Sequence, residues 1–144
     1  MSRNDCFFTN AFMGVREGDL GTGKSPAFKN DDFIVACRKL FLLQLEVQRP
    51  KVILVLGKFV GEFLAPLSDE LKDWKRIANF TAIDKLEKQV IQATFSNDIK
   101  SNLVLLIHPS LRYVNVGRRR YQQDRYHGQE AELQMVLNAM PINH

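Results

Sequence analysis

Asn10 and His108 are polar residues placed in or next to apolar segments, where their side chains could carry chemistry. Asn10 lies within the apolar run 6–13, and His108 directly follows an apolar run that ends at Ile107. A buried amide needs hydrogen-bond partners, so it either ties down backbone or reads a ligand. A single imidazole at a strand end is often structural and can also act in catalysis. Together, the amide and the imidazole could read the polar edge of one heterocycle.

A basic and aromatic segment follows His108. Residues 112–127 contain five of the ten Arg of the chain, all three Tyr and a single acid, Asp124. Arg pairs bidentately with phosphate, and Tyr stacks on bases. The segment therefore predicts a nucleic-acid-binding face, and a solvated basic surface is the alternative.

The segment from Gly18 to Ser25 fits the phosphate-loop pattern G-x-x-x-x-G-K-[ST], whose backbone amides would cradle phosphates. Its context differs from that motif, because the preceding apolar run ends at Met13 and Pro26 delays the next helix. No later predicted strand ends in an Asp that could hold magnesium. A glycine-rich loop is therefore the preferred interpretation, with a nucleotide-binding loop as the alternative.

Alternating apolar strands and helical patterns must position these residues. The sequence predicts strands over 6–13, 51–56, 89–95 and 102–107, and helices over 32–48, 57–64 and 128–140. The first helix is capped by Asn30 or Asp31. The last helix repeats Leu133, Val136, Leu137 and Met140 at helical spacing. This is an α/β layered pattern, in which we expect the strands ending at Asn10, Leu56 and Ile107 to be parallel and ligands to bind at their carboxyl ends.

Length and composition exclude several protein classes. A chain of 144 residues with 45% hydrophobic and 25% charged residues is typical of one globular domain, here residues 1–144. Two cysteines, Cys6 and Cys37, are too few for a disulfide framework or a four-cysteine metal site, so no metal is expected. A net charge of +4 does not by itself identify a nucleic-acid partner. Without a secretory leader or a membrane span, we expect a cytoplasmic protein with no membrane partner.

Three segments in series resemble landmarks of the uracil-DNA glycosylase superfamily. They are Phe8–Ala11 (FTNA), Arg49–Lys58 (RPKVILVLGK) and His108–Ser110 (HPS), and their order and spacing match the family over about residues 5–125. The resemblance implies a three-layer α/β/α fold with a parallel central sheet. It also implies a function in base-excision repair, in which a flipped uracil or related deaminated base is recognised and its N-glycosidic bond is hydrolysed.

The resemblance implies roles for individual residues. In that family the Asn of the T-N strand hydrogen-bonds the polar edge of uracil, and the His of H-P-S hydrogen-bonds uracil O2. Asn10 and His108 would therefore bind the base, and His108 would be catalytic. Ser110 would help to pinch a phosphate, and Leu111 and Arg112 would insert into the duplex. The DNA-binding set expected on uracil-containing DNA, single- or double-stranded, also includes Arg118, Arg119 and Arg120.

The chain also departs from the family pattern. The family's opening strand and water-activating loop have no counterpart in the nine residues before Asn10. We therefore expect the first central strand to be missing, through truncation, different strand pairing or another segment that fills the gap. Glycosylase activity then requires that the missing motif be supplied, and a non-catalytic nucleic-acid or nucleobase-binding module is the alternative. An uncovered sheet edge would favour self-association. Only Cys37 matches a ligand position of the iron–sulfur branch, so no cofactor is expected.

Overall fold

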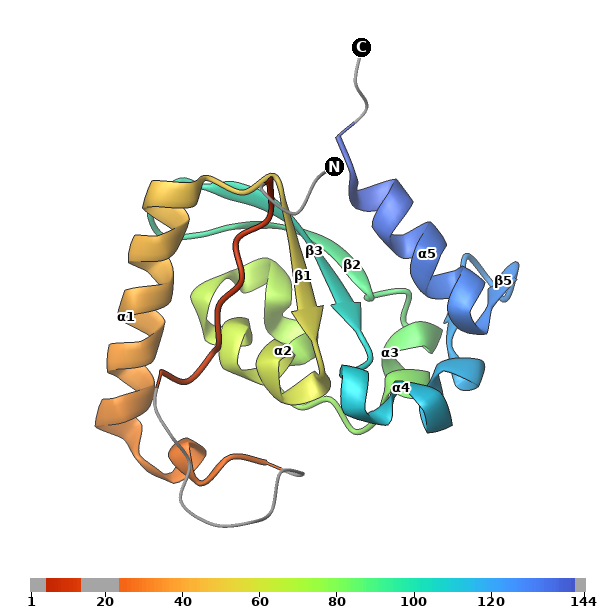
Figure 1. Ribbon diagram of the computed structural model, residues 1–144, viewed down its shortest axis with the longest axis horizontal. Coiled ribbons are helices and arrows are strands. Elements are labelled where there is room, and N and C mark those ends of the chain that lie inside the picture. The colour runs from red at the N-terminus through yellow and green to blue at the C-terminus, as the bar shows by residue number, and fades with distance from the viewer. Residues whose placement is uncertain (1–4, 14–23, 142–144) are drawn as a thin grey trace. The chain divides into compact units, whose positions relative to one another are not determined.

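The computed structural model describes residues 5–13 and 24–141, which belong to two compact units, Met1–Arg49 and Pro50–His144 (Figure 1). Each unit is described by itself below. The glycines of the phosphate-loop pattern lie outside the described residues. The expectation of a single domain over residues 1–144 stays a prediction.

The first unit is built on one long helix, α1 (Asp31–Gln48), which follows the 3-10 helix η2 (Pro26–Lys29). The side chain of Asn30 accepts a hydrogen bond from the backbone N–H of Phe33 at 3.0 Å, which satisfies a donor of the first turn. The helix ends at Arg49, whose φ of 41° is left-handed. The prediction of a capped helix is confirmed, and its buried side chains are Ile34, Cys37, Phe41 and Leu45.

Residues 6–13 form no strand, so the prediction of a buried strand there is wrong. Phe8 is 78% exposed. The contacts of the segment are made by side chains: Thr9 Oγ1 donates to Gln44 Oε1 of α1 at 3.1 Å, and the Phe12 ring packs in the same unit. A strand requires a backbone ladder to a neighbour, and among the described residues no strand pairs with this segment.

The second unit contains a mixed three-stranded sheet in the order β1 (Val52–Leu56), β3 (Lys100–Leu106), β2 (Val90–Thr94). β1 and β3 are parallel, as predicted, and Leu56 lies opposite Leu106. β2 and β3 are antiparallel, so the expectation of an entirely parallel sheet does not hold. The reason is the short connection between them, because parallel neighbours need a long crossover.

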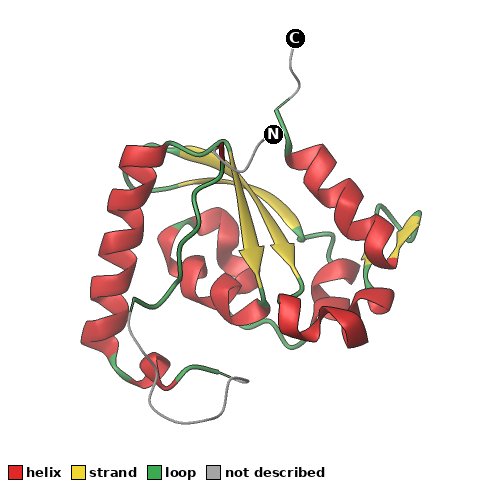
Figure 2. Cartoon of the chain, viewed as in Figure 1, coloured by secondary structure: helices red, strands yellow, loops and turns green. Residues whose placement is uncertain are grey.

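Helices pack on both faces of this sheet (Figure 2). On one face lie α2 (Lys58–Leu64) and the 3-10 helices η3 (Ala65–Leu67) and η4 (Asp69–Trp74), and on the other lies α5 (Gly128–Ala139). The remaining elements are α3 (Phe80–Lys85), α4 (Pro109–Asn115), η5 (Val116–Arg118), β4 (Arg120–Tyr121) and β5 (Tyr126–His127). Within the described ranges no helix is long and apolar enough to cross a membrane.

α5 packs on the sheet with a different face from the one its apolar spacing predicts. Its buried side chains are Ala131, Glu132, Met135 and Ala139. Leu133 and Leu137, by contrast, are 56% and 53% exposed. The small alanines let the helix pack closely on Val104 of β3, and Glu132 is held inside by an ion pair. The predicted helix is confirmed. Of its predicted apolar repeat, Val136 packs against the core, whereas Leu133, Leu137 and Met140 are exposed.

The outer strand β1 is only partly covered on the face that α5 packs against. Leu54 and Leu56 are 44% and 41% exposed. They share this face because each lies opposite a β3 residue, Val104 and Leu106, that packs in the α5 core. Among the described strands, β1 pairs with β3 alone. Apolar surface is therefore exposed at this strand, and self-association through it stays a prediction.

A buried ionic cluster ties the second unit together. Arg119 is 0% exposed and lies between η5 and β4. Its Nε and Nη2 donate to the Asp84 carboxylate of α3 at 3.0 and 3.1 Å, and its Nη1 donates to Glu132 Oε1 of α5 at 2.9 Å. Nη1 and Nη2 also donate to the Leu105 carbonyl oxygen of β3 at 3.1 Å. One guanidinium therefore connects α3, α5 and β3.

The cluster balances the cost of burying a cation. Burial lowers the pKa of Arg119, and the charge and hydrogen bonds of Asp84 raise it again. Arginine has so high an intrinsic pKa that it stays protonated in proteins, so Arg119 is a buried cation paired with two carboxylates. Its ring neighbour Phe80 lies 4.8 Å from the guanidinium carbon and adds a cation–π contact.

We expect Arg119→Ala to destabilise the second unit by about 3–5 kcal/mol, because the substitution removes the cation that is shared by two buried carboxylates and leaves Asp84 without an ion-pair partner. Urea unfolding followed by circular dichroism measures this loss. Arg118→Ala is the matched control, since Arg118 is exposed, and should change the free energy of unfolding by no more than about 0.5 kcal/mol. Equal stability of the two variants would contradict the role given to the cluster.

Candidate functional site

The carboxyl ends of β1 and β3 meet at Gly57 and His108. The N–H of Gly57 donates to the Leu106 carbonyl oxygen at 2.8 Å, which extends the parallel ladder by one residue beyond β1. Gly57 has a φ of +100°, and a Cβ atom added there would lie 3.3 Å from His108 Cβ. Only glycine adopts this conformation without strain and leaves room for the imidazole. Gly57 thus forms the support on which His108 rests.

The local backbone also fixes the tautomer of His108. His108 is the N-cap of α4, and Pro109 occupies the first turn, where no backbone N–H is needed. The N–H of Ser110 donates to His108 Nδ1 at 3.2 Å, and Ser110 Oγ lies 2.7 Å from the same nitrogen. Since a backbone N–H can only donate, Nδ1 is the acceptor and the proton of the neutral ring resides on Nε2. The exposed imidazole therefore offers an Nε2–H donor.

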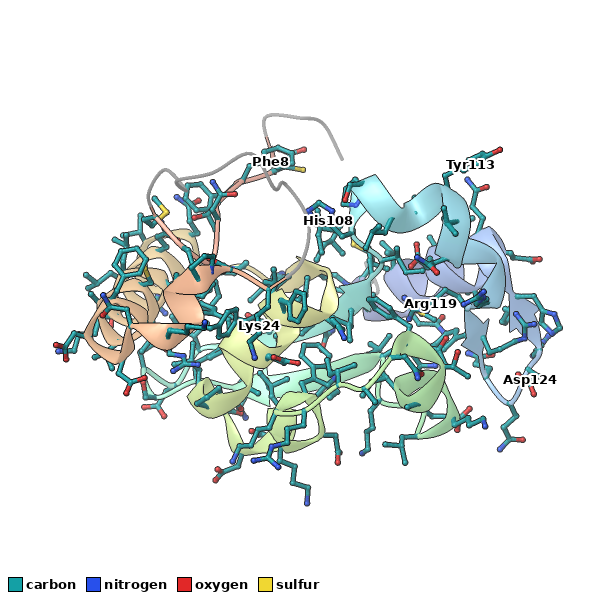
Figure 3. All side chains as sticks on the ribbon, turned by 90° about the horizontal axis from the view of Figure 1, so that it is seen from below. Phe8, Lys24, His108, Tyr113, Arg119 and Asp124 are labelled. Carbon is teal, nitrogen blue, oxygen red and sulfur yellow. The ribbon has the colours of Figure 1, made fainter. Side chains whose placement is uncertain are left out.

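α4 presents an apolar surface directly after His108. Leu111, Tyr113 and Val114 are 48%, 97% and 70% exposed. In Figure 3 Tyr113 projects from the end of the helix into solvent. The sequence analysis predicted a role for Leu111 and grouped Tyr113 with the base-stacking residues. It did not indicate that Tyr113 is the most exposed aromatic side chain of residues 112–127.

Glu132 anchors the strand end that carries His108. Its Oε1 accepts the backbone N–H of Ile107 at 2.9 Å and the Arg119 donor described above. Its Oε2 pairs with Arg112 of α4. One buried carboxylate thus holds both the residue before His108 and the helix after it. Arg112, which the sequence placed at the DNA, is 36% exposed and has this partner already.

The basic segment divides into buried and exposed side chains. Arg118 and Arg125 are exposed, and Arg120 is half-buried. Arg119 is fully buried and its donors are satisfied by protein acceptors, so the expectation that Arg119 contacts DNA is wrong. Its burial follows from the two acids, Asp84 and Glu132, that need a cation inside the unit.

Asn10 belongs to the first unit and His108 to the second. Asn10 is exposed. The expectation that the two side chains face one pocket therefore stays a prediction, as do the phosphate contact of Ser110 and the insertion of Leu111.

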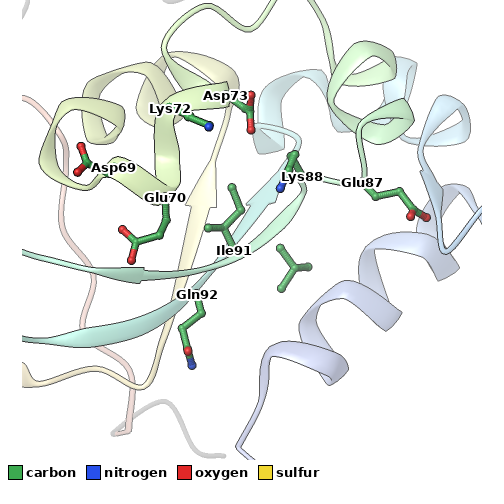
Figure 4. A pocket seen from close by; sticks show the side chains of 9 residues that line it. Asp69, Glu70, Lys72, Asp73, Glu87, Lys88, Ile91 and Gln92 are labelled. Atoms are coloured by element: carbon green, nitrogen blue, oxygen red, sulfur yellow. The ribbon is translucent and has the colours of Figure 1, made fainter.

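A hollow at the outer edge of β2 has the wrong charge for a phosphate ligand (Figure 4). It has a volume of about 550 Å³. Its charged lining consists of Asp69, Glu70, Asp73, Glu87, Lys72 and Lys88. A hydrogen bond from Ser68 lowers the pKa of Glu70, which keeps that carboxylate charged. Since acids outnumber bases here, a polyanion is repelled from this side.

Two residues important for the site, Asp84 and Glu132, escaped the sequence analysis, and Gly57 was part of a landmark segment but was given no role. Gly57 follows a strand at the position where a tight turn needs glycine, and this signal was available. The acids Asp84 and Glu132 stand next to Ile83 and Ala131 on buried helix faces, which is the pattern of an internal ion pair. No group of His, Cys, Asp and Glu side chains suited to a metal ion occurs in the described part of the chain.

Comparison with known proteins gives one family match. The model of the Uracil DNA glycosylase superfamily matches residues 1–127. No curated protein and no solved structure matches the chain. The matched range includes Asn10, Gly57 and His108 and ends at His127, before α5 begins.

We expect Gly57→Ala to displace His108 and to destabilise the second unit by about 1–3 kcal/mol, because the added Cβ meets His108 and the positive φ strains any L-residue. The measurements are urea unfolding and the ¹⁵N resonances of His108, which report the Nε2–H tautomer in the parent protein. Gly117→Ala is the control, since a Cβ at Gly117 meets nothing within 4 Å. Unchanged His108 resonances in Gly57→Ala would contradict the supporting role of Gly57.

Proposed function

The chain belongs to the uracil-DNA glycosylase superfamily, and from this premise we propose that it recognises a flipped uracil or a related deaminated base in DNA and hydrolyses its N-glycosidic bond. In this proposal the protein acts in base-excision repair. The single observation that carries it is the fixed Nε2–H donor of His108 at the carboxyl end of β3. We also propose the family's three-layer α/β/α arrangement, in which β1 and β3 are the parallel strands of the sheet.

The proposed reaction breaks the bond between the deoxyribose C1′ and uracil N1. The electron pair of that bond leaves with the base, and negative charge develops on uracil O2. A hydrogen bond from His108 Nε2–H to O2 strengthens as this charge grows, so it stabilises the transition state more than the ground state. A water molecule completes the hydrolysis at C1′ and releases a proton. Activation of this water requires the family's water-activating motif, to which no residue of the chain is assigned.

A neutral imidazole suits this role. His108 Nδ1 already accepts the Ser110 N–H, so the ring donates through Nε2 without first taking up a proton. Gly57 lies against His108, and Glu132 holds the backbone N–H of the preceding residue, Ile107. Both contacts reduce the reorganisation that the donor needs during the reaction.

Base recognition and DNA contact complete the proposal. Asn10 hydrogen-bonds the polar edge of the base, and Ser110 contacts a phosphate. Base flipping costs a few kcal/mol, which contacts in the pocket and to the backbone offset. Leu111 and Arg112 enter the space that the base leaves, and the 48% exposure of Leu111 supports its part as a wedge. Arg118 and Arg120 remain in the proposed DNA-binding set, and Arg119 does not.

The test incubates the protein with uracil-containing and uracil-free oligonucleotides, single- and double-stranded, and measures abasic sites. We expect abasic sites only with uracil, and we expect His108→Ala to lower turnover by roughly 10²- to 10³-fold, the usual loss for one oxyanion donor. His127→Ala is the matched control and should retain the parent rate, since His127 is an exposed imidazole on β5. Equal rates of the His108 variant and the parent would remove His108 from the mechanism. Binding of the oligonucleotides without abasic sites would favour the non-catalytic binding module.

Asn10→Asp tests base recognition separately. The substitution exchanges an amide donor for a carboxylate acceptor, so the base edge that the pocket accepts changes. We expect discrimination between uracil and cytosine to relax, as measured by the ratio of kcat/KM on the two substrates. Asn115→Asp, a change of the same chemistry on α4, should leave the ratio at the parent value. An unchanged ratio in Asn10→Asp would exclude Asn10 as the residue that reads the base.

A further inference from the structure

A second hollow lies at the end of the basic segment, between α3 and the hairpin formed by β4 and β5. It has a volume of about 720 Å³, which is the size of a pocket for a nucleotide. Its lining includes Thr81, Lys85, Glu87, Arg118, Tyr121 and Gln123. All of these residues belong to the second unit. Arg118 and Tyr121 belong to the basic segment that was expected to face nucleic acid, and the residues from α3 and the segment after it, among them Lys85, had no assigned role.

The cations of this hollow are available to a ligand. Lys85 and Arg118 are exposed, and neither side chain has a hydrogen-bond or ion-pair partner among the described residues. Arg120 is oriented by hydrogen bonds from its Nη1 to the carbonyl oxygens of Gly117 and Arg119, at 2.9 and 2.8 Å, and its Nε lies 3.8 Å from Asp124 Oδ1.

The carboxylates of the hollow are largely occupied. The Asp84 carboxylate pairs with the buried Arg119 and accepts the backbone N–H of Arg120 at 2.9 Å. Glu87 Oε1 accepts the backbone N–H of Gln123 at 2.8 Å. Asp84 is paired with Arg119, and Asp124 lies near Arg120. The charges that remain are Lys85, Arg118 and Glu87, so the hollow has a small excess of positive charge and attracts anions, unlike the acidic hollow at β2.

The rim of the hollow is a strained turn. Gln122, Gln123 and Asp124 have φ values of 51°, 53° and 63°, so three consecutive residues without glycine are left-handed. Such backbone persists only where the surroundings hold it, and it concentrates at ligand-binding turns. Here Glu87 stabilises the turn by accepting the N–H of Gln123. The Gln89 side chain stabilises the strand that precedes the turn by donating to the Arg120 carbonyl oxygen at 3.0 Å.

The distance along the chain surface from His108 to this hollow is one that a short segment of a nucleic-acid strand can cover. α4 and η5 lead from His108 to Arg118, and in Figure 3 the chain continues past Arg119 to Asp124 at the far end of the unit. Laid end to end, seven α-helical and three 3-10 residues extend over at most on the order of 15 Å. At about 3.4 Å of axial rise per nucleotide, this is roughly four nucleotides.

We propose that this hollow is a second nucleotide subsite, in which Lys85 and Arg118 bind the backbone phosphate of a nucleotide within about four positions of the flipped base. The proposal rests on the DNA-binding part of the proposed function. The occupant is a segment of the same DNA strand. A free nucleotide would offer the same phosphate chemistry and is distinguished by the test.

The test measures binding of uracil-free oligonucleotides by fluorescence anisotropy at several salt concentrations. We expect Lys85→Ala/Arg118→Ala to weaken binding roughly tenfold or more at about 50 mM salt and to flatten the slope of log K against log salt by up to about 1.4 on single strands or 1.8 on duplexes. Lys75→Ala/Arg76→Ala, an exposed Lys–Arg pair outside the hollow, should leave the slope at the parent value. Circular dichroism verifies that both variants are folded.

Two further arms sharpen the test. Asp124→Asn should strengthen binding, because it removes a carboxylate from the rim. Oligonucleotides shorter than about four nucleotides should lose the dependence on Lys85 and Arg118, because they are too short to reach the hollow from the surface at His108. An unchanged slope in the double variant, or an equal loss in the Lys75/Arg76 control, would overturn the proposal. Binding of thymidine monophosphate as tight as that of the oligonucleotide would replace it with a free-nucleotide site. The probes lack uracil, so this binding test does not depend on glycosylase activity. A failure of the glycosylase assay and a failure of this proposal can therefore be distinguished.

Discussion

The second unit depends on the neutralisation of one buried guanidinium. Arg119 has no exposed surface, and its charge is matched by Asp84 of α3 and Glu132 of α5. An uncompensated charge in this place would cost several kcal/mol, so the three side chains fold inward together or not at all. The cluster explains why α5 turns Glu132 rather than its leucines toward the sheet. It also fixes the start of the β4–β5 hairpin, because Arg119 directly precedes β4.

The position of His108, the candidate catalytic residue, depends on this cluster. Glu132 accepts both the Arg119 guanidinium and the N–H of Ile107, which is the residue before His108. The strand end is thus tied to the ionic centre by one carboxylate. Gly57 then limits where the imidazole can lie, and Ser110 sets which ring nitrogen carries the proton. The same contacts stabilise the interior of the unit and orient the His108 donor. The basic segment therefore contributes to the stability of the fold as well as to the charge of the surface.

Local signals predicted the elements whose cause is local. The cap at Asn30 and the apolar runs of β1, β2 and β3 depend on neighbours in sequence, and all were predicted. The antiparallel pairing of β2 with β3 was not predicted. The prediction of a strand around Phe8 was wrong, because a strand needs a neighbouring strand that the local sequence does not identify. The buried face of α5 and the burial of Arg119 depend on residues far apart in the chain. Arg118, Arg119 and Arg120 look alike in sequence, and only the distant acids Asp84 and Glu132 distinguish the middle one.

The distribution of Trp and Cys gives the two units separate optical and chemical reporters. Trp74, the single tryptophan, is fully buried in the second unit, where its Nε1 donates to the Lys88 carbonyl oxygen at 2.7 Å. Cys37 is 4% exposed in α1 of the first unit. Intrinsic tryptophan emission therefore follows the opening of the second unit and is blind to the first. The alkylation rate of the Cys37 thiol follows α1, so one unlabelled sample reveals whether the units unfold in one cooperative step or in two.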